Sequence, residues 1–240
     1  MTRNPTTNSD LEVGRIRGYF SNAAGSWDRW STGREFLVEE RQRLLGDAAR
    51  TYVGPDMSAM SVCDVGCGRG DDLAFWRDAG VPVTSLAGTE IMAENVSQAT
   101  AAVPGADVRR VDSFELPFAD AAFVVTTASL VLSTILEPSL RRMLFREMIR
   151  VTALGGVVLV YDFSVRKPTN RNVVALDRHR VGALGEAPDA AWHAAPFLPL
   201  LPTALRLPAP LRRMALAVLP RTHVLLAWRR LPAPDNGVAP

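Results

Sequence analysis

Hydrophobic positions along the chain alternate between the spacing of helices and the short unbroken runs typical of buried strands. From Leu11 to about Tyr52, apolar residues recur at helical spacing among charges, and Gly54-Pro55 ends this section. Short apolar runs then alternate with amphipathic segments. The runs that predict strands are 61–65, 83–89, 107–111, 123–132, 157–163 and 223–231. The segments that predict helices between them are 71–79, 91–102 and 139–151.

This order of elements predicts the class of fold. Strands that alternate with helices of roughly ten residues imply βαβ crossovers and a mostly parallel sheet. The long apolar run 123–132 suits a strand buried on both faces. We therefore expect an α/β, doubly wound fold in one continuous domain. Within it we expect an N-terminal helical cap at 1–55, a ligand-binding core at 56–165, and a C-terminal part at 166–240 that carries the last strands.

Composition and charge indicate the class of protein and its cellular location. The 240 residues are 48% hydrophobic and 22% charged, which is ordinary for a soluble globular protein with a core. Residues 166–240 hold eleven Lys and Arg against four Asp and Glu, which leaves sixteen against twenty-one for 1–165. The two parts should therefore meet different partners. No stretch approaches the ~20 apolar residues of a membrane span, and the N-terminus lacks a signal peptide's apolar core. Two cysteines, Cys63 and Cys67, favour a reducing, cytoplasmic location.

The first candidate chemistry lies where the predicted strand 61–65 runs into Gly66-x-Gly68-x-Gly70 and then into a helix. Glycines at such a turn let the backbone approach a ligand and adopt conformations that a Cβ would forbid. Open α/β sheets bind ligands at this carboxyl edge. The spacing differs from the dinucleotide fingerprint G-x-G-x-x-G, which disfavours a nicotinamide-dependent oxidoreductase. Tight strand-to-helix turns need glycine anyway, so the trio alone also fits a purely structural turn.

Further motifs follow along the chain, and together they resemble the ordered motifs of a known enzyme family. Segment 64–70 is similar to D-x-G-x-G-x-G, and Glu90 ends the second predicted strand. Segment 112–118, Asp-Ser-Phe-Glu-Leu-Pro-Phe, is similar to D-A-x-x-L-P-F, and segment 150–156 is similar to R-V-L-K-P-G-G. In this order, across residues 62–163, the chain resembles the class I, Rossmann-like S-adenosylmethionine-dependent methyltransferases. It departs from their usual residues at Val124, Ala153 and Leu154, positions not expected to touch cofactor.

The resemblance implies a seven-stranded sheet, S-adenosylmethionine as cofactor, and no metal. It implies that the glycine loop cradles the amino-acid end of the cofactor, that Glu90 accepts from both ribose hydroxyls, that Asp112 accepts from the adenine amine, and that Phe114 flanks the ring. The positions assigned to the cofactor are Asp64, Gly66, Cys67, Gly68, Gly70, Glu90, Ile91, Asp112, Ser113, Phe114, Ser129 and Tyr19. Plainer roles stay open: Glu90 as a solvated strand end, Asp112 as a turn residue, Phe114 as a core aromatic.

Candidate catalytic residues lie at the end of the fifth predicted strand, 157–163. Tyr161 and Asp162 lie at its carboxyl end, and one of them should face the ligand because successive strand residues alternate faces. A base matters only if the acceptor must lose a proton. Among the three scattered histidines, His179 is the preferred base over His193 and His223. Segments 161–172 and 221–223 also resemble a subset of bacterial methyltransferases that share a Tyr-Asp-Phe, an Asn/Pro-rich turn and a later Arg-Thr-His.

The methyl acceptor is expected to be a small molecule, such as a secondary metabolite or a lipophilic intermediate, methylated on O, N or C. In the family, N-terminal helices and a segment such as 186–222 build the substrate lid; Arg15, Tyr19 and Phe20 would close over the cofactor, and Trp27 and Trp30 would line the acceptor pocket. The apolar, proline-broken segment 198–219 fits a mobile lid or a patch that touches membrane. An RNA or protein methyltransferase and a non-catalytic cofactor-binding protein remain alternatives. We expect no nucleic-acid partner and a monomer or homodimer.

Overall fold

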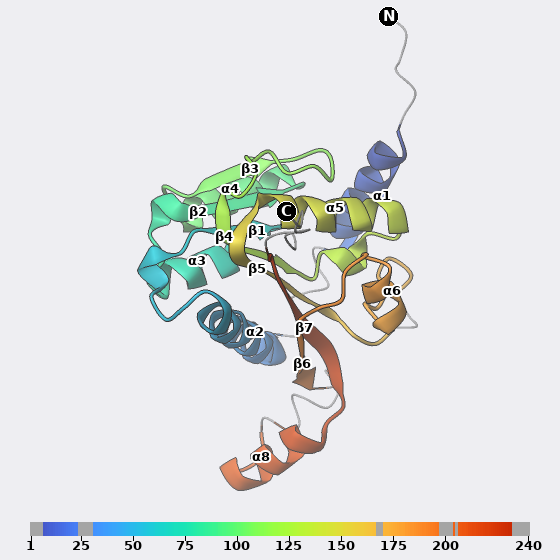
Figure 1. Cartoon of the computed structure of the whole chain (residues 1–240). Coiled ribbons are helices and arrows are strands. Elements are labelled where there is room, and N and C mark those ends of the chain that lie inside the picture. Colours follow the sequence, from blue (N-terminus) through green and yellow to red (C-terminus); the bar gives the residue numbers. More distant parts are fainter. Residues whose placement is uncertain (1–6, 24–30, 167–169, 197–203, 205, 232–240) are drawn as a thin grey trace, which may run out of the picture.

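The fold is built on one mixed sheet with helices on both faces. The computed structural model describes residues 7–23, 31–166, 170–196, 204 and 206–231 (Figure 1). The strands are β1 (Val62–Val65), β2 (Leu86–Glu90), β3 (Asp107–Arg110), β4 (Phe123–Ser129), β5 (Thr152–Phe163), β6 (Ala190–Pro196) and β7 (Arg221–Arg229). The helices are α1 (Asn8–Ala23), α2 (Ser31–Tyr52), α3 (Asp71–Asp78), α4 (Ala93–Ala102), α5 (Pro138–Val151), α6 (Arg178–Gly182) and α8 (Ala209–Val218).

The seven strands are ordered β3-β2-β1-β4-β5-β7-β6. Strands β1 to β5 pair in parallel, whereas β7 runs antiparallel to both β5 and β6. The strand order runs outward from β1 in both directions, through β2 and β3 on one side and through β4 and β5 on the other, which is the doubly wound arrangement. The mostly parallel, seven-stranded α/β fold expected from the sequence is therefore confirmed.

Several predicted boundaries differ from those observed. The predicted strand 123–132 ends at Ser129, because Leu130 has a positive φ of 61° and a 3-10 turn covers Leu132–Thr134. Strand β5 begins at Thr152 and runs through Gly155 and Gly156, earlier than the predicted start. Strand β6 was not identified in the sequence. The helical section expected from Leu11 to Tyr52 contains two helices, α1 and α2.

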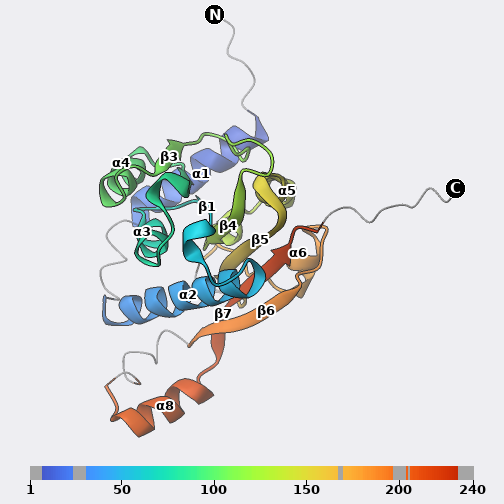
Figure 2. The same cartoon turned by 60° about the vertical axis from the view of Figure 1, so that its left-hand side comes forward.

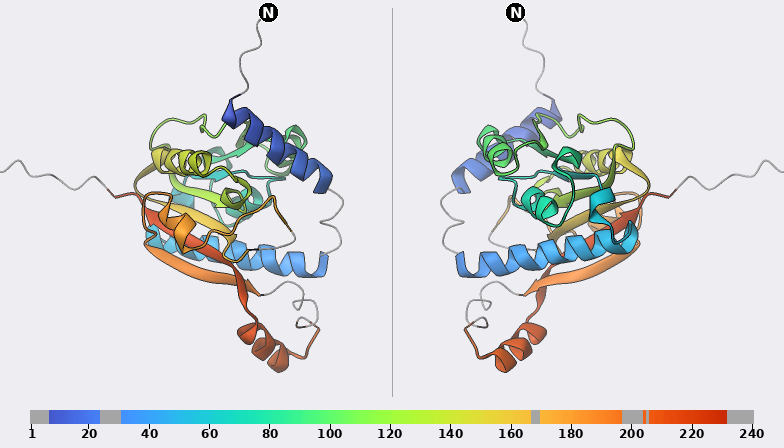
Figure 3. Two further views of the ribbon diagram at one scale, coloured as in Figure 1. Left: turned by 90° about the vertical axis from the view of Figure 1, so that its right-hand side faces the viewer. Right: turned by 90° about the vertical axis from the view of Figure 1, so that its left-hand side faces the viewer.

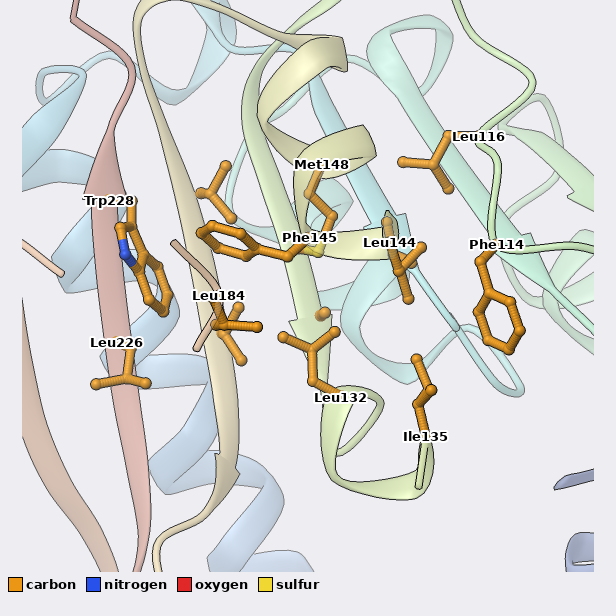
Figure 4. Packing of buried hydrophobic residues seen from close by; sticks show 14 of the residues in the cluster. Phe114, Leu116, Leu132, Ile135, Leu144, Phe145, Met148, Leu184, Leu226 and Trp228 are labelled. Atoms are coloured by element: carbon orange, nitrogen blue, oxygen red, sulfur yellow. The ribbon is translucent and has the colours of Figure 1, made fainter. Parts of the chain in front are cut away.

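Each face of the sheet has its own hydrophobic cluster. On one face, α2 packs against β5, β6 and β7, while α3 and α4 pack against β1, β2 and β3 (Figure 2). On the other face, α5 packs against β4 and β5, and apolar residues of α1 and α6 join the same cluster. Figure 4 shows this second cluster, in which the Phe145 and Trp228 rings meet edge to face at 4.8 Å. Neighbouring strand residues alternate between the clusters, so Val160 and Tyr161 point to opposite faces.

The features expected to have a functional role lie at one edge of the sheet. The parallel strands β1, β2, β4 and β5 all end there, at Val65, Glu90, Ser129 and Phe163. The connection from β6 to β7 leaves from the same edge, because Phe163 at the end of β5 pairs with His223 near the start of β7. Helix α1 crosses this edge (Figure 3), and its side chains contact the segments that follow β2 and β3.

Candidate functional site

The glycine turn after β1 joins the strand to α3 in a conformation that needs glycine. Gly66, Gly68 and Gly70 have positive φ angles of 70°, 54° and 90°. A Cβ on Gly66 would lie 2.6 Å from Cγ2 of Val131, and one on Gly70 would lie 3.0 Å from Cα of Ala99. By contrast, a Cβ on Gly68 would meet nothing within 4 Å. Gly66 and Gly70 are thus required by packing, whereas Gly68 leaves an open approach to the backbone.

Glu90 ties this turn to the end of β2. Its Oε2 accepts a hydrogen bond from the Gly68 backbone N–H at 2.9 Å, and its Oε1 accepts from the N–H groups of Ile91 and Met92 at 2.7 and 2.9 Å. The residue is 7% exposed, so it is not the solvated strand end considered above. An ionised carboxylate has about four acceptor positions. The three backbone bonds therefore leave Oε2 able to accept one more donor.

Beneath the turn lies a group of buried polar residues. Asp64 is 2% exposed and accepts a hydrogen bond from Thr127 Oγ1 on β4 at 2.8 Å. Burial, together with the nearby charge of Asp72, raises the pKa of Asp64 to about 8, against the lowering effects of Thr127 and Arg41. Its surroundings therefore favour the protonated form of the Asp64 carboxyl more than water would. It supports the strands under the glycine turn.

Asp72 forms the charged centre of this group, and the sequence did not reveal its partners. Arg41 of α2 donates to Asp72 Oδ1 at 2.7 Å, and Ser129 Oγ at the end of β4 donates to Oδ2 at 2.9 Å. The Asp72 and Arg41 side chains are only 4% and 14% exposed. Gln42 adds a bond to the same carboxylate at 3.3 Å. Ser129, predicted to touch cofactor, is thus held in place by an ion pair that joins α2 to α3.

The residues expected around the adenine lie after β3. The Asp112 side chain is 73% exposed and forms ion pairs with Arg17 of α1 and, at 3.6 Å, with Arg110. Hydrogen bonding to Arg17 lowers the pKa of Asp112 below its ordinary value. Ser113 is exposed and accepts from the Glu115 N–H at 3.3 Å. Phe114 is 5% exposed and belongs to the cluster of Figure 4, as a core aromatic would. Its contact with adenine stays a prediction.

Helix α1 bridges the two sides of the strand edge. Arg17 Nε donates to the carbonyl of Ile91 at 3.2 Å, on the β2 side. Tyr19 OH accepts from Asn170 Nδ2 at 2.9 Å, beyond the end of β5. Arg15 likewise donates to Asn172 Oδ1 at 3.3 Å. These contacts place Arg15 and Tyr19 at the carboxyl edge of the sheet. The two tryptophans predicted to line an acceptor pocket, Trp27 and Trp30, lie outside the described residues.

Tyr161 and His223 form a stacked pair at the end of β5. Their ring centroids are 5.3 Å apart with 14° between the planes, and Phe163 lies 4.5 Å from the same imidazole. Burial lowers the pKa of His223 to about 4, assisted by the charge of Arg41. Burial also raises the pKa of Tyr161 above its ordinary value. Both rings are therefore neutral near pH 7, and Thr222 Oγ1 lies 3.0 Å from His223 Nδ1.

The other two catalytic candidates lie elsewhere. Asp162 is fully buried on the opposite face, and its carboxylate accepts from the backbone N–H groups of Ser133 and Phe163 at 2.9 and 2.8 Å. Burial raises the pKa of Asp162 to about 6. His179 is exposed on α6, and no contact within the described ranges joins it to Tyr161 or Asp162. The three candidates are thus not gathered in one place, and their catalytic roles stay predictions.

Comparison with known proteins explains why these features occur together. The family model described as a methyltransferase domain matches residues 63–160. Residues 63–160 therefore carry the sequence of a methyltransferase domain, on the fold expected above for the class I family. Over 139 residues it is 32% identical to a malonyl-[acyl-carrier protein] O-methyltransferase of Pectobacterium atrosepticum, covering 58% of this chain and 49% of the relative. Over 123 residues it is 31% identical to a demethylmenaquinone methyltransferase of Paenarthrobacter aurescens, covering 51% and 44%.

Solved structures resemble the methyltransferase domain and its flanking elements. A geranyl diphosphate C-methyltransferase from Streptomyces coelicolor, solved with Mg²⁺, geranyl diphosphate and S-adenosyl-L-homocysteine, has a TM-score of 0.57 at 14% identity, covering 79% of this chain and 77% of that one. A [4+2]-cyclase has a TM-score of 0.56 at 18% identity, covering 79% and 81%. At these identities the likeness concerns the fold. The chain spans about half the length of the curated relatives it matches.

Two further observations concern the surroundings of the domain. No helix in the described parts of the chain combines the length and the apolar character needed to span a membrane. Over the same residues, no group of three or more His, Cys, Asp and Glu side chains is arranged to hold a metal ion. Cys63 and Cys67 are both buried and free, and burial raises the pKa of each thiol above its ordinary value.

Proposed function

We propose that this chain binds S-adenosylmethionine at the carboxyl edge of its sheet and transfers the methyl group to a small molecule. The observation that carries the proposal is the open approach to Gly68, the one glycine of the turn at which an added Cβ would meet nothing within 4 Å. Gly68 also bonds directly to Glu90, the expected ribose acceptor.

The residues present fit this cofactor. The backbone near Gly68 would hold the amino-acid end, the remaining acceptor position on Glu90 Oε2 would take a ribose hydroxyl, and the exposed Asp112 would accept from the adenine amine. When bound, the cofactor would supply a sulfonium methyl already activated for attack by the acceptor. The chain must then align the acceptor more than activate it. Arg41 and Asp72 would keep Ser129 and α2 fixed while this happens.

The acceptor is proposed to lie beside Tyr161 and His223. Both rings are buried at the carboxyl end of β5, 2% and 4% exposed, and because both are neutral they neither attract nor repel a charged group strongly. Tyr161 would donate a hydrogen bond and would not act as a base, since its raised pKa opposes ionisation. The relatives described above are named for malonyl-[acyl-carrier protein] and for demethylmenaquinone as the molecules they methylate. A lipophilic small-molecule acceptor is the class that these observations favour.

A second candidate function is cofactor binding without methyl transfer. A [4+2]-cyclase shares the fold, so the architecture alone does not require a methyl-transfer reaction. The remaining parts of the proposal are a cytoplasmic location, consistent with two free thiols, no nucleic-acid partner, and a monomer or homodimer.

Calorimetric titration with S-adenosylmethionine, S-adenosylhomocysteine and NAD tests the cofactor assignment. We expect micromolar binding of both sulfur compounds and none of NAD, with Glu90→Ala weakening the binding. Folded protein that binds neither sulfur compound would overturn the proposal. Incubation with methyl-labelled cofactor and a panel of lipophilic acceptors then separates the two candidates, because only a methyltransferase moves label into an organic product.

A further inference from the structure

Helix α8 is an amphipathic helix that the core does not cover. It projects away from the body of the molecule in the connection between β6 and β7 (Figures 1 and 3). None of its residues is buried. Leu211, Met214 and Val218 are 52%, 67% and 80% exposed, which places them among the most exposed large apolar side chains described.

These three apolar residues lie on one face. Their spacing of three and four residues stacks them along one side of a helix. Steps of about 100° per residue place Arg212 and Arg213 on the other side of the helix, about 130° to either side of the middle of this apolar face, with the half-buried Leu216 between them. Pro208 at the N-cap and Pro210 in the first turn begin the helix without requiring backbone donors that proline lacks. Helix α8 thus has an exposed apolar stripe on one side and two guanidinium groups on the other.

The charge around α8 has a single sign. Residues 190–231 contain six arginines and no Asp or Glu. Arg221 pairs with Glu40 of α2 at 3.5 Å, and Arg230 donates to backbone carbonyls of β5 and α5. Within the described residues, no carboxylate pairs with Arg206, Arg212 or Arg213. Helix α8 therefore carries positive charge that no carboxylate of the described residues neutralises.

The position of α8 relates it to the candidate site. The β6–β7 connection leaves the sheet at the edge where Phe163 pairs with His223, beside the Tyr161–His223 stack. Strand β7 therefore joins α8 directly to the residues proposed to meet the acceptor.

We propose that α8 docks on an anionic lipid surface, with Leu211, Met214 and Val218 entering the acyl boundary and Arg212 and Arg213 contacting lipid phosphates. Apolar burial and electrostatic attraction act together in helices of this kind. A lipid surface fits better than a second copy of the chain, because the same basic segment on a symmetric partner would oppose itself. Docking does not depend on the proposed methyl transfer, although it would bring lipid-dissolved acceptors to the correct edge.

Sedimentation of the full chain with vesicles tests this docking. We expect binding to vesicles of phosphatidylcholine mixed with phosphatidylglycerol, little binding to phosphatidylcholine alone, and weakening as salt is added. The triple variant Leu211→Gln, Met214→Gln, Val218→Gln should lower the partition coefficient by about tenfold or more. The double variant Arg212→Glu, Arg213→Glu should lower it by a similar factor on anionic vesicles only.

A matched control replaces the same number of exposed apolar residues elsewhere: Leu11→Gln, Leu154→Gln, Leu231→Gln. This control should bind vesicles like the wild type, and circular dichroism should show all variants folded. Equal binding by the wild type and the α8 triple variant would overturn the proposal, as would no binding of the wild type to anionic vesicles. Light scattering adds a third decisive outcome, since a dimer that the α8 triple variant converts to monomer would make the stripe a self-interface instead.

Discussion

The carboxylate of Glu90 accepts a hydrogen bond from the backbone N–H of Gly68 over 2.9 Å. This bond joins the turn after β1 to the end of β2, and the same carboxylate holds the next two backbone N–H groups, those of Ile91 and Met92. The side chain proposed to bind ribose is therefore also the side chain that orders the loop proposed to bind the amino-acid end. Substitutions here should affect stability and cofactor affinity together.

Glu90→Gln keeps the length of the side chain but replaces one acceptor oxygen with an NH₂ donor. At least one of the three backbone N–H groups would then face a donor, so we expect a lower melting temperature and a loss of about 1–3 kcal/mol in cofactor binding. Scanning calorimetry and titration with S-adenosylhomocysteine measure the two effects. Glu94→Gln, on the exposed side of α4, is the matched control and should change neither. Wild-type affinity in Glu90→Gln would show that this carboxylate does not bind the cofactor.

Alanine at two positions of the glycine turn should separate packing from ligand approach. In Gly66→Ala the new Cβ would lie 2.6 Å from Val131, so we expect a clear loss of thermal stability. In Gly68→Ala the added methyl meets no protein atom and the cost is backbone strain of about 1–2 kcal/mol. Gly68→Ala should nevertheless lose more cofactor affinity, measured by calorimetry on folded protein. Tight cofactor binding by Gly68→Ala would contradict the proposed approach path.

Periodicity predicted the parallel part of the fold well, because strands buried on both faces and amphipathic helices carry strong local signals. It failed where pairing between distant parts of the chain determines which residues form a strand. Strand β6 includes Ala190, Ala191 and Ala194, which lack β-branching, and it lies at the sheet edge, where it pairs with β7. The predicted strand 123–132 was too long because the turn at Leu130, with its positive φ, leaves no trace in hydropathy.

The same difference between local and long-range signals applies to the candidate site. The glycine turn and Glu90 could be found from spacing, because their roles depend on neighbouring backbone. Arg41 could not, since it stands among other charged residues of α2 and meets Asp72 only after the helix packs on the sheet. His223 was ranked below His179, yet antiparallel pairing of β7 with β5 stacks it on Tyr161. The Arg-Thr-His element at 221–223 was the one local signal that pointed to it.

Tyr161→Phe tests whether the phenol orients the acceptor. The ring and its stack on His223 would be preserved, so we expect unchanged stability and unchanged cofactor affinity, with kcat/KM for the acceptor lowered about tenfold or more through one lost hydrogen bond to the reacting group. Because the raised pKa keeps Tyr161 neutral, the pH profile of the rate should keep its shape. Initial rates with labelled cofactor provide the measurement. A variant that loses an ionisation from its pH profile would make Tyr161 a base.

His223 should give the protein a measurable dependence of stability on pH. Its pKa is about 6.5 in an unfolded chain and about 4 when buried, so between these values the unfolded state binds more protons. The free energy of unfolding should therefore rise with pH across this window, by roughly 3 kcal/mol at most. Asp162, whose pKa is raised to about 6, acts in the opposite direction but is present in both proteins compared. We expect His223→Gln to be less destabilised by acid than the wild type in urea unfolding at pH 4.5 and 7. Equal pH dependence in both would mean that the imidazole is not buried in neutral form.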